Sequence, residues 1–160
     1  MDSIVVPIFR NKYKKNDSKI FPRTEHSLYF DGCSKGNPGQ SGIGAVLYKM
    51  DEEIWSAARY LGAECTNNEA EYNALILGLE EASAREIEEL TVFGDSLLVI
   101  NQVNGVYKVK AKNLFSLFDK VERLKKCFKS VTFQHVLREY NKRADELSNI
   151  ALNACYENRV

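Results

Sequence analysis

The sequence has no excess of charge of either sign, no long apolar run and no signal peptide. Its 22 Lys and Arg residues balance 22 Asp and Glu residues, so no overall positive field attracts it to nucleic acid or to an anionic membrane. Any polyanion binding must therefore be local. Residues 1–15 carry a short apolar run followed by charge, the reverse of a signal peptide, and no later run approaches a membrane-spanning length. We expect an intracellular protein that makes no contact with a membrane.

Cysteine and histidine are also scarce. The four cysteines are far apart in the sequence and form no CxxC pair: Cys33, Cys65, Cys127 and Cys155. Because His26 and His135 are the two histidines, this distribution disfavours a zinc site, and we expect reduced thiols. The composition is otherwise that of an ordinary globular protein, with 44% apolar and 28% charged residues. At 160 residues the chain is long enough for one domain with its own core.

Residues 1–25 differ from the rest of the chain because they are basic and show no sustained periodicity. The basic residues of this segment are Arg10, Lys12, Lys14, Lys15, Lys19 and Arg23. We predict a flexible basic N-terminal arm at residues 1–25, followed by one folded domain over residues 26–157. A merely solvated tail is an equally good interpretation of the arm.

After residue 25, short β-rich runs separated by turn residues give way to alternating strand and helix patterns. The first helix begins with a capping box at Thr66 and Glu69. The predicted strands are 28–30, 43–48, 54–60, 90–93 and 131–137, and the predicted helices are 66–85, 97–103, 114–128 and 141–155. Three consecutive strands followed by strand–helix alternation predict an α/β fold in which helices cover a mixed sheet.

Two carboxylates stand out in the first half of this domain. Asp31 ends the first predicted strand and opens an Asp-Gly sequence, for which turn formation is the ordinary interpretation. Glu71 lies on the helical stripe that should pack on the sheet, where an unpaired charge is costly. A charge at the edge of that stripe, close to the helix N-terminus, is an equally good interpretation of Glu71.

Two further carboxylates lie at predicted helix beginnings. Asp95 stands at the N-cap position of the helix at 97–103 and Asp145 in the first turn of the last helix, so each alone has a structural explanation. Three of the four carboxylates nevertheless sit at strand ends or helix beginnings, where open α/β sheets build their ligand sites. Oxygen ligands without His or Cys favour Mg²⁺ or Mn²⁺. Two such ions about 3.5 to 4 Å apart promote in-line displacement at phosphorus, so the pattern predicts phosphodiester hydrolysis.

Four ordered motifs surround these carboxylates. They are Tyr29-Phe30-Asp31-Gly32 with Gly36-Asn37-Pro38-Gly39, Thr66-Asn67-Asn68 with Glu71-Tyr72, Asp95-Ser96, and Ala144-Asp145-Glu146-Leu147. Together they resemble ribonuclease H of type 1, over about residues 27–155. The resemblance implies a ribonuclease H-like mixed five-stranded sheet, with three antiparallel strands and then parallel strands, flanked by helices.

The resemblance also implies an activity and a set of site residues. The activity is hydrolysis of the RNA strand of RNA–DNA hybrids by two-metal-ion catalysis, which leaves 5′-phosphate and 3′-hydroxyl ends. Asp31 would bridge two Mg²⁺ ions, with Glu71 and Asp95 on one ion and Asp145 on the other, and Mn²⁺ is an alternative metal. The implied substrate-binding residues, which contact consecutive 2′-hydroxyls or phosphates, are Cys33, Ser34, Lys35, Asn37, Thr66, Asn67, Asn68 and Ser96.

The sequence departs from the family pattern just before Asp145. Many members have a histidine in this loop, but residues 137–143 contain none and resemble the short-loop, histidine-less branch of the family. Arg138 and Glu139 are the candidates for an auxiliary role. His135 lies earlier, and we predict that it is a sheet residue rather than a substitute.

Two departures concern substrate contacts. Leu97 stands where a glutamine commonly contacts the minor groove, which puts one substrate hydrogen bond in doubt. The long basic protrusion of some bacterial members is absent, and Lys108 and Lys110 lie in the shorter connection that replaces it. We predict that these lysines bind phosphates of the DNA strand, although a solvated loop would have the same composition.

Other functions stay open at the level of sequence. The chain is alternatively a catalytically weak nucleic-acid-binding module, or a nuclease of the same fold that acts on double-stranded RNA. The presence of all four carboxylates argues against a loss of catalysis. A third alternative is an interaction subunit that docks a partner through its basic arm, although we expect a monomer.

Overall fold

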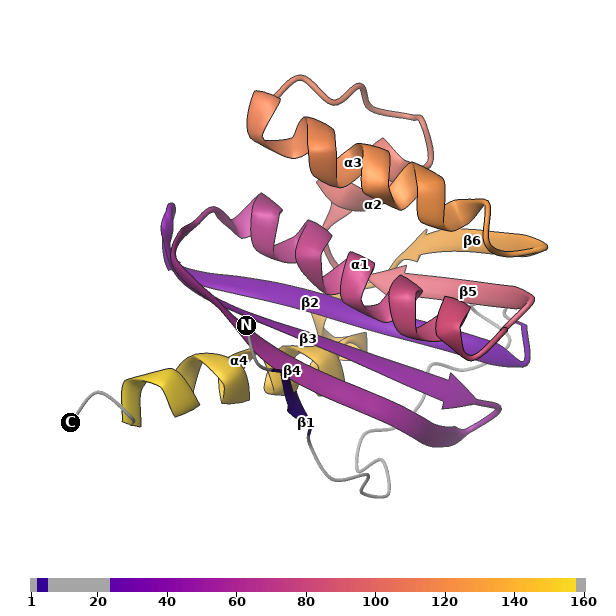
Figure 1. The fold of residues 1–160 in the computed structure, drawn as a ribbon, viewed down its shortest axis with the longest axis horizontal. Helices are drawn as coiled ribbons and strands as arrows, with labels where there is room; N and C mark the ends of the chain where they lie inside the picture. The colour runs from indigo at the N-terminus through magenta and orange to yellow at the C-terminus, as the bar shows by residue number, and fades with distance from the viewer. Residues whose placement is uncertain (1–2, 6–23, 158–160) are drawn as a thin grey trace.

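The computed structural model describes residues 3–5 and 24–157. A six-stranded sheet forms the centre of the molecule, with strand order β1-β4-β3-β2-β5-β6 (Figure 1). The strands are β1 (Ser3–Val5), β2 (His26–Gly36), β3 (Gly39–Lys49), β4 (Glu52–Cys65), β5 (Glu89–Gly94) and β6 (Ser130–His135). Strands β2, β3 and β4 pair as an antiparallel meander, and β5 and β6 continue the sheet in parallel with β2. These five strands form the predicted mixed sheet.

Strand β1 adds a sixth strand that the sequence did not predict. It pairs antiparallel with β4, with Ser3 opposite Arg59 and Val5 opposite Ala57. Three residues of the predicted arm therefore belong to the sheet. The six basic residues of the arm lie outside the described residues, so the flexible basic arm stays a prediction.

The first two long strands extend beyond the apolar runs that predicted them. Antiparallel pairing of β2 with β3 continues through Asp31, opposite Gly44, to Gly36, opposite Gly39. Asp31 therefore lies inside a strand, and the prediction that it ends the strand is wrong, because backbone pairing of the hairpin continues where the apolar side chains stop. The parallel pairing of β2 with β5 does end at Phe30, opposite Gly94. Asp31 is thus the first residue beyond the parallel part of the sheet.

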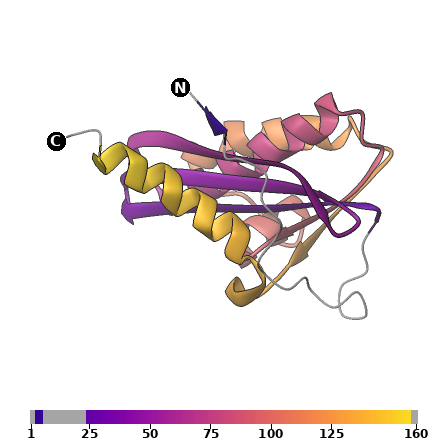
Figure 2. The same cartoon turned by 90° about the horizontal axis from the view of Figure 1, so that it is seen from below.

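Helices cover both faces of the sheet. The helix α1 (Asn67–Ala84) packs on one face together with α2 (Leu97–Val103) and α3 (Lys112–Lys125), while α4 (Lys142–Glu157) crosses the opposite face (Figures 1 and 2). The predicted capping box of α1 is confirmed, because Thr66 accepts from the Glu69 backbone and Glu69 accepts from that of Thr66. A short 3-10 turn, η1 (Arg138–Tyr140), connects β6 to α4.

The alternation of side chains along β2 divides the core between the two faces. Leu28 and Phe30 point into the larger core under α1, whereas Tyr29 belongs to a smaller core under α4 with Val46 and Leu147. Asp31 continues the alternation toward α4. Among the described residues, no helix is long and apolar enough to cross a membrane. The described cysteines Cys33, Cys65 and Cys127 are free thiols.

Candidate active site

Three of the predicted carboxylates meet at the end of the parallel part of the sheet. Asp31 on β2, Glu71 on α1 and Asp95 after β5 each offer an oxygen, and these oxygens lie within 4.8 Å of one another. Asp31 and Glu71 are buried, with exposed fractions of 5% and 8%, and Asp95 is half-buried. Residues that are far apart in the sequence thus form one cluster of oxygen donors, which we call the carboxylate triad.

The absence of a side chain at Gly32 allows Glu71 to reach Asp31. A Cβ atom at Gly32 would lie 2.4 Å from the Ala70 carbonyl carbon and 2.6 Å from the Glu71 backbone nitrogen. The backbone of α1 therefore contacts β2 directly beside Asp31. The Asp-Gly pair that looks like a turn in the sequence serves this close approach inside a strand.

Asp95 enters the triad because its neighbour caps the next helix. The N-cap of α2 is Ser96, whose hydroxyl accepts a hydrogen bond from the Val99 backbone at 3.3 Å. The prediction that Asp95 is the N-cap is therefore wrong by one residue. The Asp95 carboxylate remains directed toward Asp31 and Glu71, and its backbone carbonyl lies 3.2 Å from Nε2 of His135.

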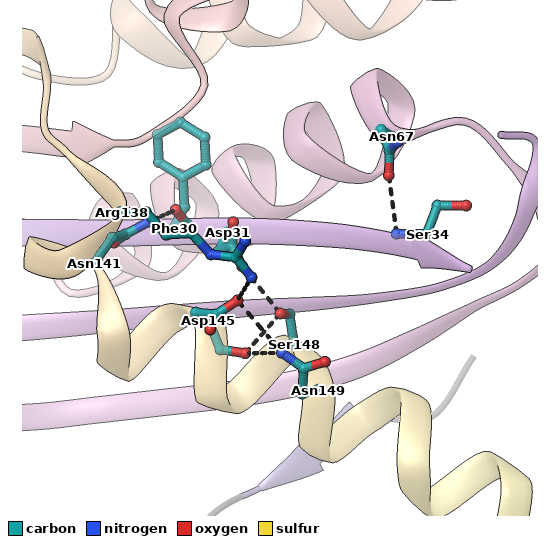
Figure 3. Close-up of polar contacts among 9 residues, drawn as sticks. All are labelled: Phe30, Asp31, Ser34, Asn67, Arg138, Asn141, Asp145, Ser148 and Asn149. Atoms are coloured by element: carbon teal, nitrogen blue, oxygen red, sulfur yellow. Dashed lines mark hydrogen bonds and ion pairs between the residues drawn. The ribbon is translucent and has the colours of Figure 1, made fainter. Parts of the chain in front are cut away.

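Asp145, the fourth predicted carboxylate, lies in the first turn of α4 beside Arg138 and Asn149 (Figure 3). It lines one cleft with the triad but is not part of the triad. Its Oδ1 lies 3.4 Å from an Arg138 guanidinium nitrogen and 3.4 Å from Nδ2 of Asn149. From the same helix, the Ser148 hydroxyl lies 3.1 Å from Oδ2 of Asp31. Helix α4 therefore contributes both a carboxylate and a hydrogen-bond donor to the site.

Burial and mutual repulsion raise the pKa values of the triad. The pKa of Asp31 rises from 3.8 to about 8, first because burial removes water and then because Asp95 and Asp145 repel its charge. Burial, followed by repulsion from Asp31 and Asp95, holds the pKa of Glu71 well above its usual value of 4.5. Burial also raises the pKa of Asp95. A cation that compensates their charge therefore favours ionisation of all three carboxylates near neutral pH.

The triad fits a divalent cation. Oxygen Oε2 of Glu71 is buried and has no hydrogen-bond partner among the described residues, which leaves an acceptor available for a ligand. The donor set consists of carboxylate oxygens, the hard ligands that Mg²⁺ and Mn²⁺ prefer. Asp31, Glu71 and Asp95 could therefore hold a divalent metal ion.

The triad lines a cleft of about 500 Å³ that also contains part of the predicted substrate-binding set. Cys33, Ser34 and Asn67 lie in its wall. The Ser34 backbone nitrogen donates to Oδ1 of Asn67 at 3.0 Å, and the Asn67 backbone nitrogen donates to Oδ1 of Asn37 at 3.0 Å. These hydrogen bonds connect the β2–β3 hairpin to the start of α1.

The other predicted substrate residues lie around this cleft or away from it. Lys35 is exposed on β2, while Asn68 is partly buried in the first turn of α1. The Thr66 hydroxyl is occupied by the cap of α1, at 3.0 Å from a Glu69 carboxylate oxygen. Lys108 and Lys110 are exposed in the connection between α2 and α3, and Lys108 borders a separate hollow beside Tyr107 and Phe115.

Sequence reasoning missed three residues at the site. His135 ends β6, as a sheet residue should, but it also lines the cleft. Ser148 contacts Asp31, and Nδ2 of Asn141 donates to the Phe30 backbone carbonyl at 2.9 Å. The spacing of Ser148, one helical turn after Asp145, was a signal that could have placed it on the same face of α4.

Comparison with known proteins shows the family to which this chain belongs. A family model described as reverse transcriptase-like matches residues 29–151, so the chain belongs to this family of ribonuclease H-like proteins. Ribonuclease H of Pseudomonas putida is 36% identical over 139 residues, which cover 76% of this chain and 89% of that protein. The chain is therefore homologous to ribonuclease H enzymes.

Solved structures agree in fold. The N-terminal RNase H domain of Rv2228c from Mycobacterium tuberculosis superposes with a TM-score of 0.80 at 35% identity, covering 84% of this chain and 98% of that chain. LC11-RNase H1, solved in complex with an RNA/DNA hybrid, gives a TM-score of 0.78 at 37% identity, covering 82% and 99%. The full bifunctional protein Rv2228c is 38% identical over 125 residues, and the matched part spans 34% of its length. This chain thus corresponds to about a third of that relative.

Proposed function

We propose that this protein is an endoribonuclease of the type 1 ribonuclease H family that hydrolyses the RNA strand of RNA–DNA hybrids. The products carry 5′-phosphate and 3′-hydroxyl ends. The observation that carries this proposal is the buried triad of Asp31, Glu71 and Asp95, which opens into a cleft together with Asp145. The relative LC11-RNase H1, which was solved with an RNA/DNA hybrid, supports the choice of substrate.

The four carboxylates would hold two Mg²⁺ ions, or two Mn²⁺ ions. Asp31, Glu71 and Asp95 would hold one ion, and Asp31 and Asp145 would hold the other. Bound divalent ions supply activation of water and stabilisation of the leaving oxygen during hydrolysis of a phosphodiester. The raised pKa values of the triad mean that metal binding must compete with protons.

The chain's own residues orient the hybrid around this centre. Main-chain groups from Cys33 to Lys35, together with Asn37, Asn67 and Asn68, contact consecutive 2′-hydroxyls and so distinguish RNA from DNA. The hydrogen bonds from Ser34 to Asn67 and from Asn67 to Asn37 hold these groups in place before substrate binds. Preorganisation of this kind lowers the cost of ordering the groups at binding.

Other residues contact phosphates or act beside the triad. Thr66, Asn67 and Ser96 lie at the beginnings of α1 and α2, where backbone N–H groups favour anions. Lys108 and Lys110 bind phosphates of the DNA strand from the connection between α2 and α3. In the absence of a loop histidine, Arg138 and Glu139 on η1 take the auxiliary role, and Arg138 lies within 3.4 Å of Asp145. The enzyme acts as an intracellular monomer.

Cleavage of three substrates tests this proposal. A uniform RNA–DNA hybrid, single-stranded RNA and double-stranded RNA are incubated with Mg²⁺, Mn²⁺ or EDTA, using the intact protein and Asp95→Asn. We expect metal-dependent cutting of the hybrid that the substitution abolishes. Cutting of double-stranded RNA alone would reassign the substrate, and no cutting by a folded protein would favour a nucleic-acid-binding module.

A further inference from the structure

Ser148 connects two of the candidate metal ligands from within α4. The residue is completely buried, and its hydroxyl lies 3.1 Å from Oδ2 of Asp31 and 2.8 Å from the Asp145 backbone carbonyl (Figure 3). A serine hydroxyl has one proton to donate. A carboxylate is the stronger of these two acceptors, because hydrogen bonds to charged groups are shorter and stronger than those between neutral groups.

The position of Ser148 is fixed by the backbone contact between α4 and β3. A Cβ atom at Gly42 would lie 2.3 Å from the Ser148 carbonyl oxygen, and one at Gly44 would lie 2.8 Å from its backbone nitrogen. Gly44 is the residue paired with Asp31 across the β2–β3 ladder. The two glycines thus let α4 approach the sheet at the point where Ser148 can reach Asp31.

The surroundings of Asp31 contain few groups that stabilise one orientation of its carboxylate. Glu71 also hydrogen-bonds Asp31, but it donates only while it carries a proton. Once the carboxyl groups of Glu71, Asp95 and Asp145 are ionised around a metal ion, none of them donates a hydrogen bond to Asp31. Ser148 is a neutral donor held on a rigid helix. Groups of this kind, which contact a metal ligand but not the metal, commonly orient the ligand.

We infer that Ser148 is a positioning residue: its hydroxyl donates to Oδ2 of Asp31 and fixes that carboxylate in the orientation that binds metal. Asp31 is the ligand shared by both proposed ion sites. Through Ser148, the orientation of the Asp31 carboxylate also depends on the position of α4, the helix that carries Asp145. This inference rests on the metal site of the proposed function. It assigns to the site a residue that contacts neither substrate nor metal.

Titration of the full chain with Mn²⁺ in a calorimeter tests the inference without substrate. We expect Ser148→Ala to bind Mn²⁺ about 10-fold more weakly than the wild type, the lower end of the range for such orienting groups. Ser148→Thr, which keeps the hydroxyl, should bind more tightly than Ser148→Ala. Alanine favours a helix, so Ser148→Ala should fold.

Ser27→Ala is the matched control. Ser27 is also a buried serine, on β2, but its hydroxyl has no hydrogen-bond partner among the described residues. We expect Ser27→Ala to bind Mn²⁺ like the wild type. In cleavage of the hybrid, Ser148→Ala should lower kcat more than it changes KM. Its hydroxyl contacts the side chains of Asp31 and Cys33, whereas the proposed 2′-hydroxyl contact near Cys33 is made by main-chain groups.

A double-mutant cycle separates the two acceptors of Ser148. The loss of stability caused by Ser148→Ala should be smaller in an Asp31→Ala background than in the wild type, measured without metal. Equal losses in both backgrounds would assign the hydroxyl to the Asp145 carbonyl or to the Cys33 side chain and overturn the inference. Equal Mn²⁺ affinities of Ser148→Ala and the wild type would also overturn it. A wild type that binds no Mn²⁺ would instead contradict the proposed function itself.

Discussion

Helices α1 and α4 approach the sheet from opposite faces, and each brings one carboxylate to the site by different means. Glu71 on α1 is placed by backbone contact over Gly32, and its Oε2 has no hydrogen-bond partner among the described residues. The carboxylate of Asp145 on α4 instead contacts two polar side chains, those of Arg138 and Asn149. One carboxylate is thus positioned by close packing and the other by polar contacts, so different substitutions should disturb them.

The largest effect is expected from breaking the ion pair that anchors the first turn of α4. Arg143 donates to both carboxylate oxygens of Glu53 on β4, at 2.7 and 3.1 Å, and the Glu53 side chain is 1% exposed. Glu53→Ala leaves the largely buried Arg143 guanidinium with the more distant Glu146, at 3.6 Å, as its remaining ion-pair partner, so we expect a loss of about 3 kcal/mol in the free energy of unfolding, the lower end of the range for broken buried pairs. Urea unfolding measures this loss. Glu52→Ala, at the exposed neighbouring position, is the control and should change stability little.

The next largest loss of stability should come from adding a side chain at Gly32, where the backbones of β2 and α1 are in contact. Gly32→Ala places a methyl group 2.4 Å from the α1 backbone, so α1 must shift at a cost of about 1 to 3 kcal/mol. Glu71 moves with the helix, and metal affinity should fall. Gly44→Ala meets Leu147, Ala144 and Ser148 on α4, so it should destabilise the fold and disturb the site through α4 rather than by displacing Glu71. Wild-type stability and Mn²⁺ affinity in Gly32→Ala would contradict the role of close packing.

Asp31→Asn should have a smaller effect of opposite sign, because it should stabilise the metal-free protein. Because its folded-state pKa of about 8 lies above the usual 3.8, the folded protein keeps a proton that the unfolded chain loses between these values. The stability of the metal-free protein should therefore fall as pH rises from about 4 to 8. Asp31→Asn should reduce this slope and raise the melting temperature at pH 8 by at least about 3 °C in EDTA. A wild-type melting temperature that rises over this pH range would refute the argument.

The smallest effect on stability is expected at Arg138. Its side chain is 78% exposed, and the contact with Asp145 is 3.4 Å long. Exposed pairs of this kind contribute little, so Arg138→Ala should change the free energy of unfolding by less than about 0.5 kcal/mol. Urea unfolding of Arg138→Ala and Glu53→Ala under the same conditions compares their losses in the free energy of unfolding. A loss comparable to that of Glu53→Ala would show that the contact from the η1 loop anchors α4 as strongly as the Glu53 pair, which would contradict this ranking.

Local patterns predicted most of the fold because local physics determines it. The capping box at Thr66 and Glu69 sets the start of α1, and apolar alternation locates the strands. The errors are also local: Asp95 and Ser96 are both good N-caps, and the sequence does not say which side chain turns toward the helix. Asp31 could not be placed inside a strand, because the pairing that extends β2 depends on its partner β3.

The composition of the site was less predictable than the fold. Motifs named the carboxylates, but Ser148 is 117 residues from Asp31 and Arg143 is 90 residues from Glu53. Such contacts depend on strand register and on how closely a helix approaches the sheet. The periodicity of apolar residues along the chain reveals neither the strand register nor the distance between helix and sheet. Gly44 falls in the predicted strand 43–48, but the strand pattern does not show that Gly42 and Gly44 allow a helix to come close.

The position of these two glycines fixes Asp145 between close contacts. The atoms nearest Gly42 and Gly44 belong to Ala144, Leu147, Ser148 and Leu152, within a helix of 16 residues that spans about 24 Å. Because Asp145 lies inside this stretch, a tilt of α4 about the glycine contacts would displace it less than it displaces the last turn of the helix. Asn153, exposed just beyond the last of these contacts, is therefore a suitable attachment point for a spectroscopic label that reports on the helix without disturbing the proposed metal ligands.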